Sequence, residues 1–205
     1  MHVIIIASYL IAAAAFLAGT ALLGVIWRGQ RTGALLILVM LVSTLWGGVL
    51  AYAEWQPAVE VNWVLLAEVI RYGAWIAFVS ALFGAWPASG LLRGIRFIAH
   101  ALWVVLALYC LWPMVGFPQV IAFRFNVSVP LVGVLVLALT GVIFLEQIYR
   151  NVRPEQRWAL KFLVIALGAM FAYDIFLYSY ALLYRQFNIS AWAARGFIDV
   201  LLVPL

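Results

Sequence analysis

Several ionisable residues lie within or at the start of long apolar runs of this chain, where charge is expensive. Glu68 and Arg71 interrupt one run, Asp174 interrupts another, and Asp199 begins the last. A charged side chain at the centre of a membrane helix costs roughly 2.5–3.5 kcal/mol on insertion scales unless it is paired or in contact with water. Such residues are retained either to form ion pairs inside a helix bundle or to bind something polar.

Helical spacing groups the first two charges with aromatic side chains. Positions 68, 71, 72 and 75 follow the i, i+3, i+4, i+7 pattern, so Tyr72 and Trp75 extend the face of Glu68 and Arg71. Glu68 and Arg71 are three residues apart and can neutralise each other on that face. The spacing predicts a polar, aromatic stripe on one helix.

The second charged run has its own stripe. Asp174, Tyr178 and Arg185 share one face, and tyrosines follow the neighbouring face. Counted at about 1.5 Å per residue from the ends of the runs, Glu68, Arg71 and Asp174 all fall roughly 10–17 Å deep in the outer half of the membrane. Arg71 therefore has two candidate acidic partners at similar depth, Glu68 on its own helix and Asp174 on the other.

Two interpretations of these residues stay open. In one, they form a tyrosine-rich pocket, open to the outside, that senses a small ligand, a lipid headgroup or a proton. In the other, a salt bridge joins the third and sixth runs, and the tyrosines fill the core and the interface. The candidate ligand-binding or signal-sensing residues are Glu68, Arg71, Tyr72, Trp75, Asp174, Tyr178 and Asp199.

No residue pattern in the chain predicts catalysis. It has no Walker loop, HExxH, G-x-S-x-G or glycine-rich dinucleotide turn. His2 and His100 have no partners at metal-ligand spacing, and Cys110 is the only cysteine, so no metal site is predicted. Glu146 and Arg150, four residues apart, predict an exposed helix pair.

Composition determines which elements hold these residues. Hydrophobic residues make up 69% of the chain and charged residues 9%, and the mean hydropathy is +1.16. A soluble domain has roughly 45–50% apolar and about 25% charged residues. We therefore expect one all-α polytopic membrane domain over 1–205. The expected spans cover about 4–27, 33–53, 61–85, 97–115, 129–149, 159–184 and 196–205.

The seventh run is shorter than the others. It has about ten residues, roughly 15 Å of helix against a hydrocarbon core of about 30 Å. Six full spans and a truncated seventh are therefore expected, and a chain that ends inside a membrane segment suggests a fragment of a longer protein. A re-entrant or interfacial tail is the alternative.

Basic residues predict the orientation of the helices. Eight lie on one side of the expected membrane and three on the other. The eight are Arg28, Arg31, Arg93, Arg96, Arg150, Arg153, Arg157 and Lys161, and the three are Arg124, Arg185 and Arg195. The positive-inside rule places the eight in the cytoplasm and the N-terminus outside. The basic residues form no contiguous patch, so no nucleic-acid partner is expected.

The C-terminal third resembles the N-terminal membrane region of PrsK-type sensor histidine kinases, which belong to the PEP-CTERM/XrtA exosortase systems of Gram-negative bacteria. The residues that carry the resemblance are 146–158 (EQIYRNVRPEQRW), Lys161-Phe162, 180–186 (YALLYRQ), 192–197 (WAARGF) and Pro204-Leu205. Before residue 146 the similarity is only a row of hydrophobic spans.

The resemblance implies a signal-input domain in the bacterial inner membrane. In that family a GAF-like segment, a histidine-bearing dimerisation helix pair and an ATP-binding kinase domain follow the membrane region; this sequence contains none of them. ATP and Mg²⁺ are therefore expected only for that kinase part. The lipid bilayer, a second copy of the full-length chain and a response regulator are the expected partners. A small transporter or channel, or a non-catalytic assembly subunit of an envelope complex, are the alternatives.

Overall fold

The computed structural model of this protein describes residues 1–27, 29–56, 58–83, 90–114, 126–152, 154–201 and 203. Over these residues the chain is helical and contains no strand. The helices are α1 (His2–Ile26), α2 (Arg31–Trp55), α3 (Val61–Phe83), α4 (Gly90–Leu111), a short 3₁₀ turn η1 (Trp112–Met114), α5 (Ser128–Asn151), α6 (Pro154–Tyr184) and α7 (Ile189–Val200).

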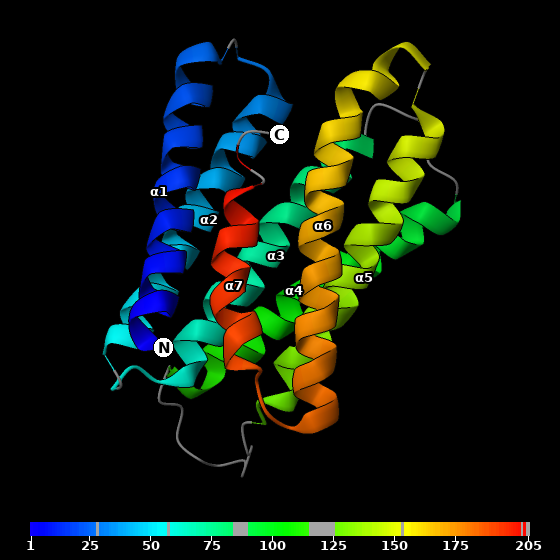
Figure 1. Cartoon of the computed structure of the whole chain (residues 1–205). Coiled ribbons are helices and arrows are strands. Elements are labelled where there is room, and N and C mark those ends of the chain that lie inside the picture. Colours follow the sequence, from blue (N-terminus) through cyan, green and yellow to red (C-terminus); the bar gives the residue numbers. More distant parts are fainter. Residues whose placement is uncertain are drawn as a thin grey trace.

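Six of these helices are long and apolar enough to cross a bilayer. They match the six full spans predicted from composition, and a shorter helix, α7, follows them, so the all-α membrane architecture is confirmed. The molecule is a multi-pass membrane protein of one helical bundle (Figure 1). Its N-terminus and the start of α7 lie at the same end of the bundle.

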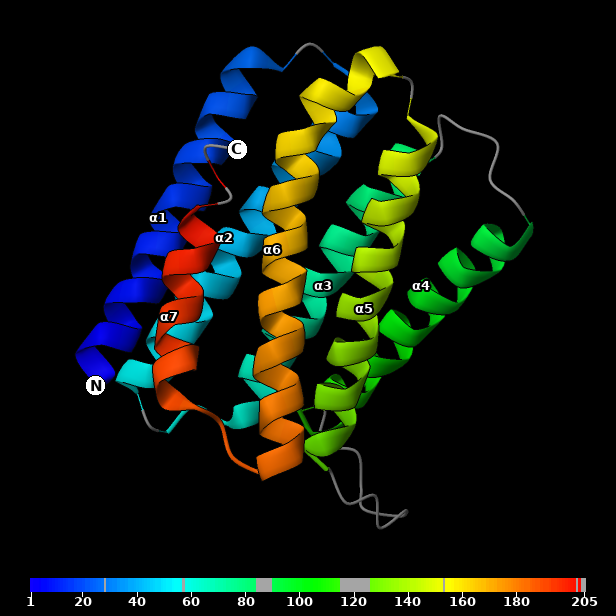
Figure 2. The same ribbon diagram turned by 45° about the vertical axis from the view of Figure 1, so that its right-hand side comes forward.

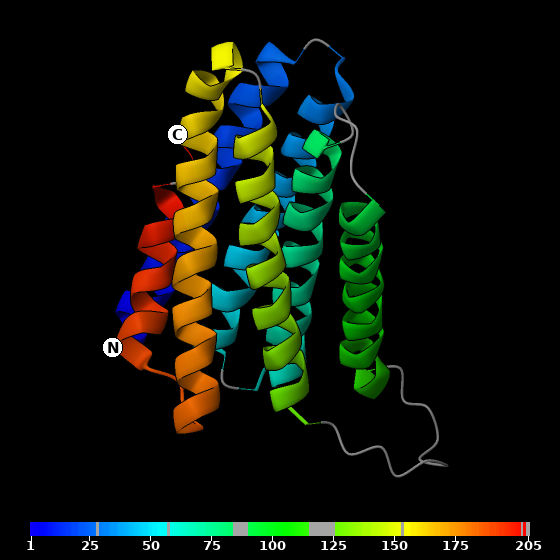
Figure 3. The same cartoon turned by 90° about the vertical axis from the view of Figure 1, so that its right-hand side faces the viewer.

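α3 is the central helix of the bundle. It packs against α2, α4 and α5, and the hairpins α1–α2 and α5–α6 lie on either side of it. α7 fits between α1 and α6, whereas α4 lies at the opposite edge of the bundle (Figures 2 and 3). The position of α3 explains why the chain can place charges on it, because its side chains face protein on most sides.

The apolar interior has two parts. The larger core is built by α3, α4, α5 and α6 with contributions from α1 and α2. The smaller core lies among α1, α2 and α7 and consists of Ile5, Tyr9, Trp46, Leu50, Ala51 and Ala193. The charged residues described below lie where the two cores meet.

The predicted bounds of the seventh run, 196–205, were wrong, because α7 covers Ile189–Val200. Its first residue follows Asn188, whose side-chain oxygen accepts a hydrogen bond from the Ala191 amide at 3.1 Å and caps the helix. Arg185, with φ of 53°, lies just beyond α6 and turns the chain back toward this cap. The prediction started too late because it treated Arg195 as a loop residue.

α7 can pack closely on α1 because a glycine lies at the contact. A Cβ on Gly196 would lie 2.6 Å from the carbonyl carbon of Ser8, inside van der Waals contact. α1 approaches α2 in a similar way, since a Cβ on Gly47 would lie 2.9 Å from the Tyr9 carbonyl oxygen. Small residues at helix interfaces are how membrane helices bring their backbones together.

The fourth predicted span also began too late, at 97 instead of Gly90. Arg93 and Arg96 belong to the first turns of α4, and Arg93 is exposed there, as expected for a side chain that extends toward the membrane surface. The orientation of the bundle remains a prediction. Arg28, Arg124 and Arg153, which contribute to it, lie outside the described residues, as do Pro204 and Leu205 of the resemblance.

Candidate functional site

Three helices bring five charged side chains together inside the bundle. α3 supplies Glu68 and Arg71, α6 supplies Asp174, and α7 supplies Arg195 and Asp199; each is 1% exposed. We call these five residues the charge cluster. Charged groups are almost never fully buried unless they are paired, so the pairing within the cluster determines what it can do.

Arg195 is the centre of the charge cluster. Its Nε donates to Asp174 Oδ1 at 2.6 Å and its Nη1 donates to Glu68 Oε1 at 2.5 Å. Its Nη2 donates to both acids, to Glu68 Oε2 and Asp174 Oδ2, each at 3.0 Å. The planar guanidinium thus binds two carboxylates in the bidentate geometry that only arginine offers, and it joins α3 and α6 through α7.

Arg71 makes the second ion pair. Its Nη2 lies 2.9 Å from Asp199 Oδ1 and 3.1 Å from the Met170 sulfur. Its guanidinium carbon also lies 3.8 Å from the ring centroid of Trp46, a cation–π contact. The pairing is less complete than that of Arg195, because Arg71 Nε and Nη1 and Asp199 Oδ2 have no hydrogen-bond partner among the described residues.

Tyrosines fix the helices around these ion pairs. Tyr72 donates a short hydrogen bond to Asp174 Oδ2, and its ring stacks on Phe171 with centroids 6.2 Å apart. The first turn of α7 is held from two sides, since Tyr9 donates to the Trp192 carbonyl at 3.0 Å and Tyr173 donates to the Ala191 carbonyl at 2.7 Å. The cluster is therefore positioned by α1 as well as by its own helices.

The structure changes the predicted pairing. Arg71 was expected to pair with Glu68 or Asp174, and instead it pairs with Asp199, while Glu68 and Asp174 both pair with Arg195. The expected pairing was wrong because Arg195 had been assigned to an outer loop, which left Arg71 as the only cation available. The four-residue spacing of Arg195 and Asp199 was a signal that both belong to one helical face.

Two other predicted members of the polar stripes lie elsewhere. Trp75 is buried, but its ring contacts Phe78 of the same helix, and its indole nitrogen has no hydrogen-bond partner among the described residues. Arg185 lies exposed beyond the end of α6. The other candidate residues lie in or beside the charge cluster. Tyr72 donates to Asp174, and the centroid of the Tyr178 ring lies 5.4 Å from the guanidinium carbon of Arg195, which was not among the predicted residues.

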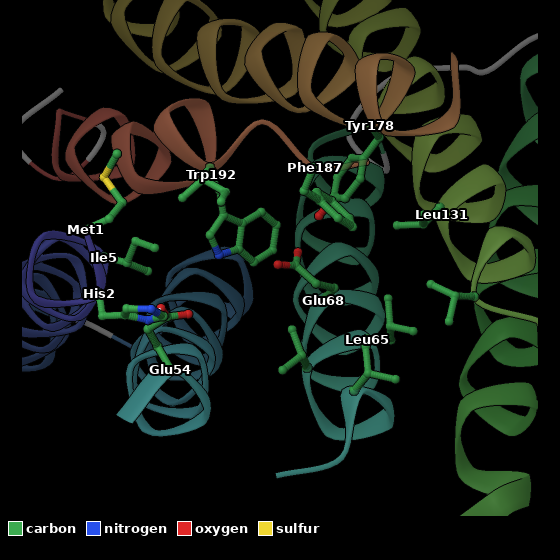
Figure 4. A pocket seen from close by; sticks show the side chains of 14 residues that line it. Met1, His2, Ile5, Glu54, Leu65, Glu68, Leu131, Tyr178, Phe187 and Trp192 are labelled. Carbon is green, nitrogen blue, oxygen red and sulfur yellow. The ribbon is translucent and has the colours of Figure 1, made fainter. Parts of the chain in front are cut away.

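A pocket of about 380 Å³ adjoins the charge cluster at the end of the bundle where α1 begins (Figure 4). Most of its wall is apolar. Glu68 and Tyr178 line it and point toward one another from α3 and α6, while the ion pair between His2 and Glu54 lies at its rim. Among the described residues, the pocket is lined by Met1, His2, Ile5, Glu54, Val61, Val64, Leu65, Glu68, Val127, Leu131, Tyr178, Phe187, Ile189 and Trp192.

The other polar groups have simpler surroundings. Glu146 and Arg150 form the predicted exposed pair at 3.2 Å. The Nδ1 atom of His100 lies 2.7 Å from the carbonyl oxygen of Arg96, and the Cys110 thiol is buried. Among the described residues, no three His, Cys, Asp or Glu side chains are arranged to hold a metal ion.

Comparison with known proteins gives no match: no family profile, curated protein or solved structure is similar to this chain.

Proposed function

We propose that this chain is the membrane-embedded input domain of a sensor histidine kinase in a bacterial inner membrane. The single observation that carries the proposal is the shared use of Glu68, which lines the pocket and also accepts two of the four hydrogen bonds that Arg195 donates from α7. A molecule that binds near Glu68 would perturb the residue that holds α7. The kinase part of the proposal rests on the sequence resemblance of residues 146–205 to the membrane region of PrsK-type sensor histidine kinases.

α7 is the element through which such a signal would leave the pocket. It contributes two of the five members of the charge cluster and is packed on α1 through Gly196. Side chains join α3 to α6 and α7: the ion pairs of the charge cluster do so, and Tyr72 stacks on Phe171 of α6. A packed element with two discrete arrangements is what conformational signalling requires.

The mechanism is a shift between two positions of α7. In one, Arg195 binds both acids; in the other, a ligand at Glu68 weakens that contact, and α7 moves relative to α3 and α6. The ligand can change the equilibrium only by its different affinity for the two arrangements. A dimeric kinase continuing from α7 would report the movement by transferring phosphate from ATP to its histidine and then to a response regulator.

The test uses the complete gene product. The reading frame beyond Leu205 is determined, and the full-length protein is placed in lipid nanodiscs to measure autophosphorylation with ATP and Mg²⁺. Pocket substitutions such as Val64→Trp should change the autophosphorylation rate, whereas Glu146→Gln in the exposed pair should leave it unchanged. An open reading frame without an ATP-binding domain would overturn the proposal.

A transporter is the second candidate, because Glu68 lies at the inner end of a pocket that opens at one end of the bundle. A transporter would need polar groups that continue toward the other end. Instead, the interior there consists of apolar side chains such as Phe144, Leu145 and Ile148. We therefore favour signalling. Counterflow of a labelled ligand in proteoliposomes would show instead that the protein is a transporter.

A further inference from the structure

The charge cluster contains more acid than base. Glu68, Asp174 and Asp199 contribute three carboxylates, while Arg71 and Arg195 contribute two guanidiniums, and all five are 1% exposed. Fully ionised, these residues carry a net charge of −1 in a low-dielectric interior, where an uncompensated charge is very unfavourable. The free Oδ2 atom of Asp199 agrees with this excess. A positive group close to the cluster would compensate for it.

The pocket is where such a group can approach. Val61 is at the start of α3 and Glu68 is seven residues further along, so the pocket reaches about 10 Å into the bundle from the helix end. Its volume of about 380 Å³ falls within the range of roughly 300–1,000 Å³ that is usual for small-molecule sites. The Glu68 carboxylate is the charged group at its inner end.

A second polar side chain is aimed into the same place. Tyr178 is 1% exposed and lines the pocket, and its hydroxyl faces Glu68. Among the described residues, no group donates a hydrogen bond to that hydroxyl oxygen. Buried hydroxyl groups normally have a partner, so the phenol oxygen is available to accept a hydrogen bond from a bound donor beside the carboxylate.

From these features we infer that the pocket binds an amphiphile with one ammonium head group and an apolar tail. The head group would donate to Glu68 and Tyr178 at the inner end, and the tail would lie along the apolar wall formed by Leu65, Leu131 and Phe187. The inference deepens the proposed function and rests on it for the site's role, because it names the chemical class of signal that the pocket would detect.

The opening of the pocket suits the same class of ligand. The rim carries the Glu54 carboxylate in an ion pair with His2, so an approaching ammonium group meets acidic side chains at the rim and at the inner end. The described residues that line the pocket include no lysine or arginine. Arg195 lies behind Glu68, where its charge is already shared between two carboxylates.

The test compares two probes of equal length that differ in charge. n-Octylamine is protonated at pH 7, as expected for an alkyl ammonium with a pKa near that of lysine, about 10.4, whereas n-octanol is neutral. The protein is placed in phosphatidylcholine nanodiscs, binding of each probe is measured by titration calorimetry, and empty nanodiscs give the contribution from partitioning. We expect saturable octylamine binding at least about tenfold tighter than octanol binding, as for a hydrogen bond to a charged group.

Two variants separate the pocket from the membrane. Tyr178→Phe removes only the free hydroxyl, should fold normally and should weaken octylamine binding about three- to tenfold. Val64→Trp fills the pocket without altering the charge cluster and should abolish binding of both probes. Glu146→Gln removes an acid from the exposed pair at the other end and should leave both affinities unchanged.

The outcomes are decisive for the inference. Equal affinity for the two probes would overturn the inference, because it would show that the positive charge of the head group adds nothing to binding. Absence of saturable binding, or octylamine binding that Val64→Trp and Tyr178→Phe leave unchanged, would overturn it as well. Because the measurement uses no kinase readout, its failure is distinct from the failure of the proposed function, which depends on the reading frame and on autophosphorylation.

Discussion

Two interfaces of the central helix α3 are built on different physical principles. Toward α6 and α7 it is joined by the ion pairs of Glu68 and Arg71. Toward α4 it is joined by close apolar packing, in which the Trp103 indole lies over Gly73 and donates a hydrogen bond to the Val69 carbonyl at 2.9 Å. The first interface depends on charge balance and the second on shape.

The difference explains an unusual feature of α3. Over its most apolar 18 residues, α3 has a mean hydropathy of 1.5, the lowest of the six spans. Yet 67% of that stretch is buried inside the protein, against 17% of the corresponding stretch of α4. In a bilayer a helix without charge near its middle can face lipid, whereas a helix that carries charge there must be enclosed by protein. The apolar surface of α4 is left for lipid.

The largest expected effect is at Arg195. Arg195→Leu would remove the arginine that pairs with Glu68 and Asp174, and breaking a buried ion pair from one side costs about 3–5 kcal/mol. Unfolding of the purified protein in mixed micelles, followed by circular dichroism, should show that loss. A decrease below about 1 kcal/mol would mean that the two acids have another partner or are protonated.

A smaller loss is expected where α7 meets α1. Gly196→Val places a side chain against the Ser8 backbone, and overpacking of this kind costs about 1–3 kcal/mol. Because the displacement would move α7, the two ion pairs should weaken together. Gly168→Val is the matched control, since its Cβ would meet nothing within 4 Å. Equal losses for the two variants would contradict the close contact of α1 and α7.

The apolar interface of α3 should respond by a similar amount and for a different reason. Gly73→Ala would drive a methyl group into the Trp103 indole and break its hydrogen bond to Val69, for a loss of about 1–3 kcal/mol. The loss should be independent of salt and pH. Gly73→Ala combined with Gly196→Val should give additive losses, because the two sites share no partner; strong coupling would show that the interfaces are not separate.

The smallest effect is expected at the exposed ion pair. Glu146→Gln breaks the contact with Arg150, and helix pairs of this kind contribute only about 0.3–0.5 kcal/mol. Raised salt should reduce the difference further, as it screens exposed charges. A loss as large as that of Arg195→Leu would contradict the conclusion that buried ion pairs contribute more to stability than this exposed pair.

The sequence predicted the membrane bundle well because composition alone decides it. Long apolar runs fix six spans, and the helical spacing of Glu68, Tyr72 and Asp174 indicated residues that meet inside the bundle. These are local periodicities, which a sequence displays directly.

The sequence did not predict which charges pair. Arg195 looked like a loop residue because it directly precedes the last apolar run, and the short α7 begins at Ile189, after the Asn188 cap and seven residues before the predicted start. The choice between Asp174 and Asp199 as the partner of Arg71 depends on how far along the axes of α3 and α6 the helix α7 lies, which we call its height. That height is a tertiary property, set by contacts such as that of Gly196 with Ser8.

The central claim is that Arg195, from α7, holds the acids of α3 and α6. It is tested most directly by two double-mutant cycles on unfolding free energy, one with Asp174→Asn and Arg195→Gln and the other with Asp174→Asn and Arg71→Gln. The structure predicts a coupling energy of about 2 kcal/mol or more for Asp174 with Arg195, and a clearly smaller one for Asp174 with Arg71. Stronger coupling of Asp174 to Arg71 would contradict it.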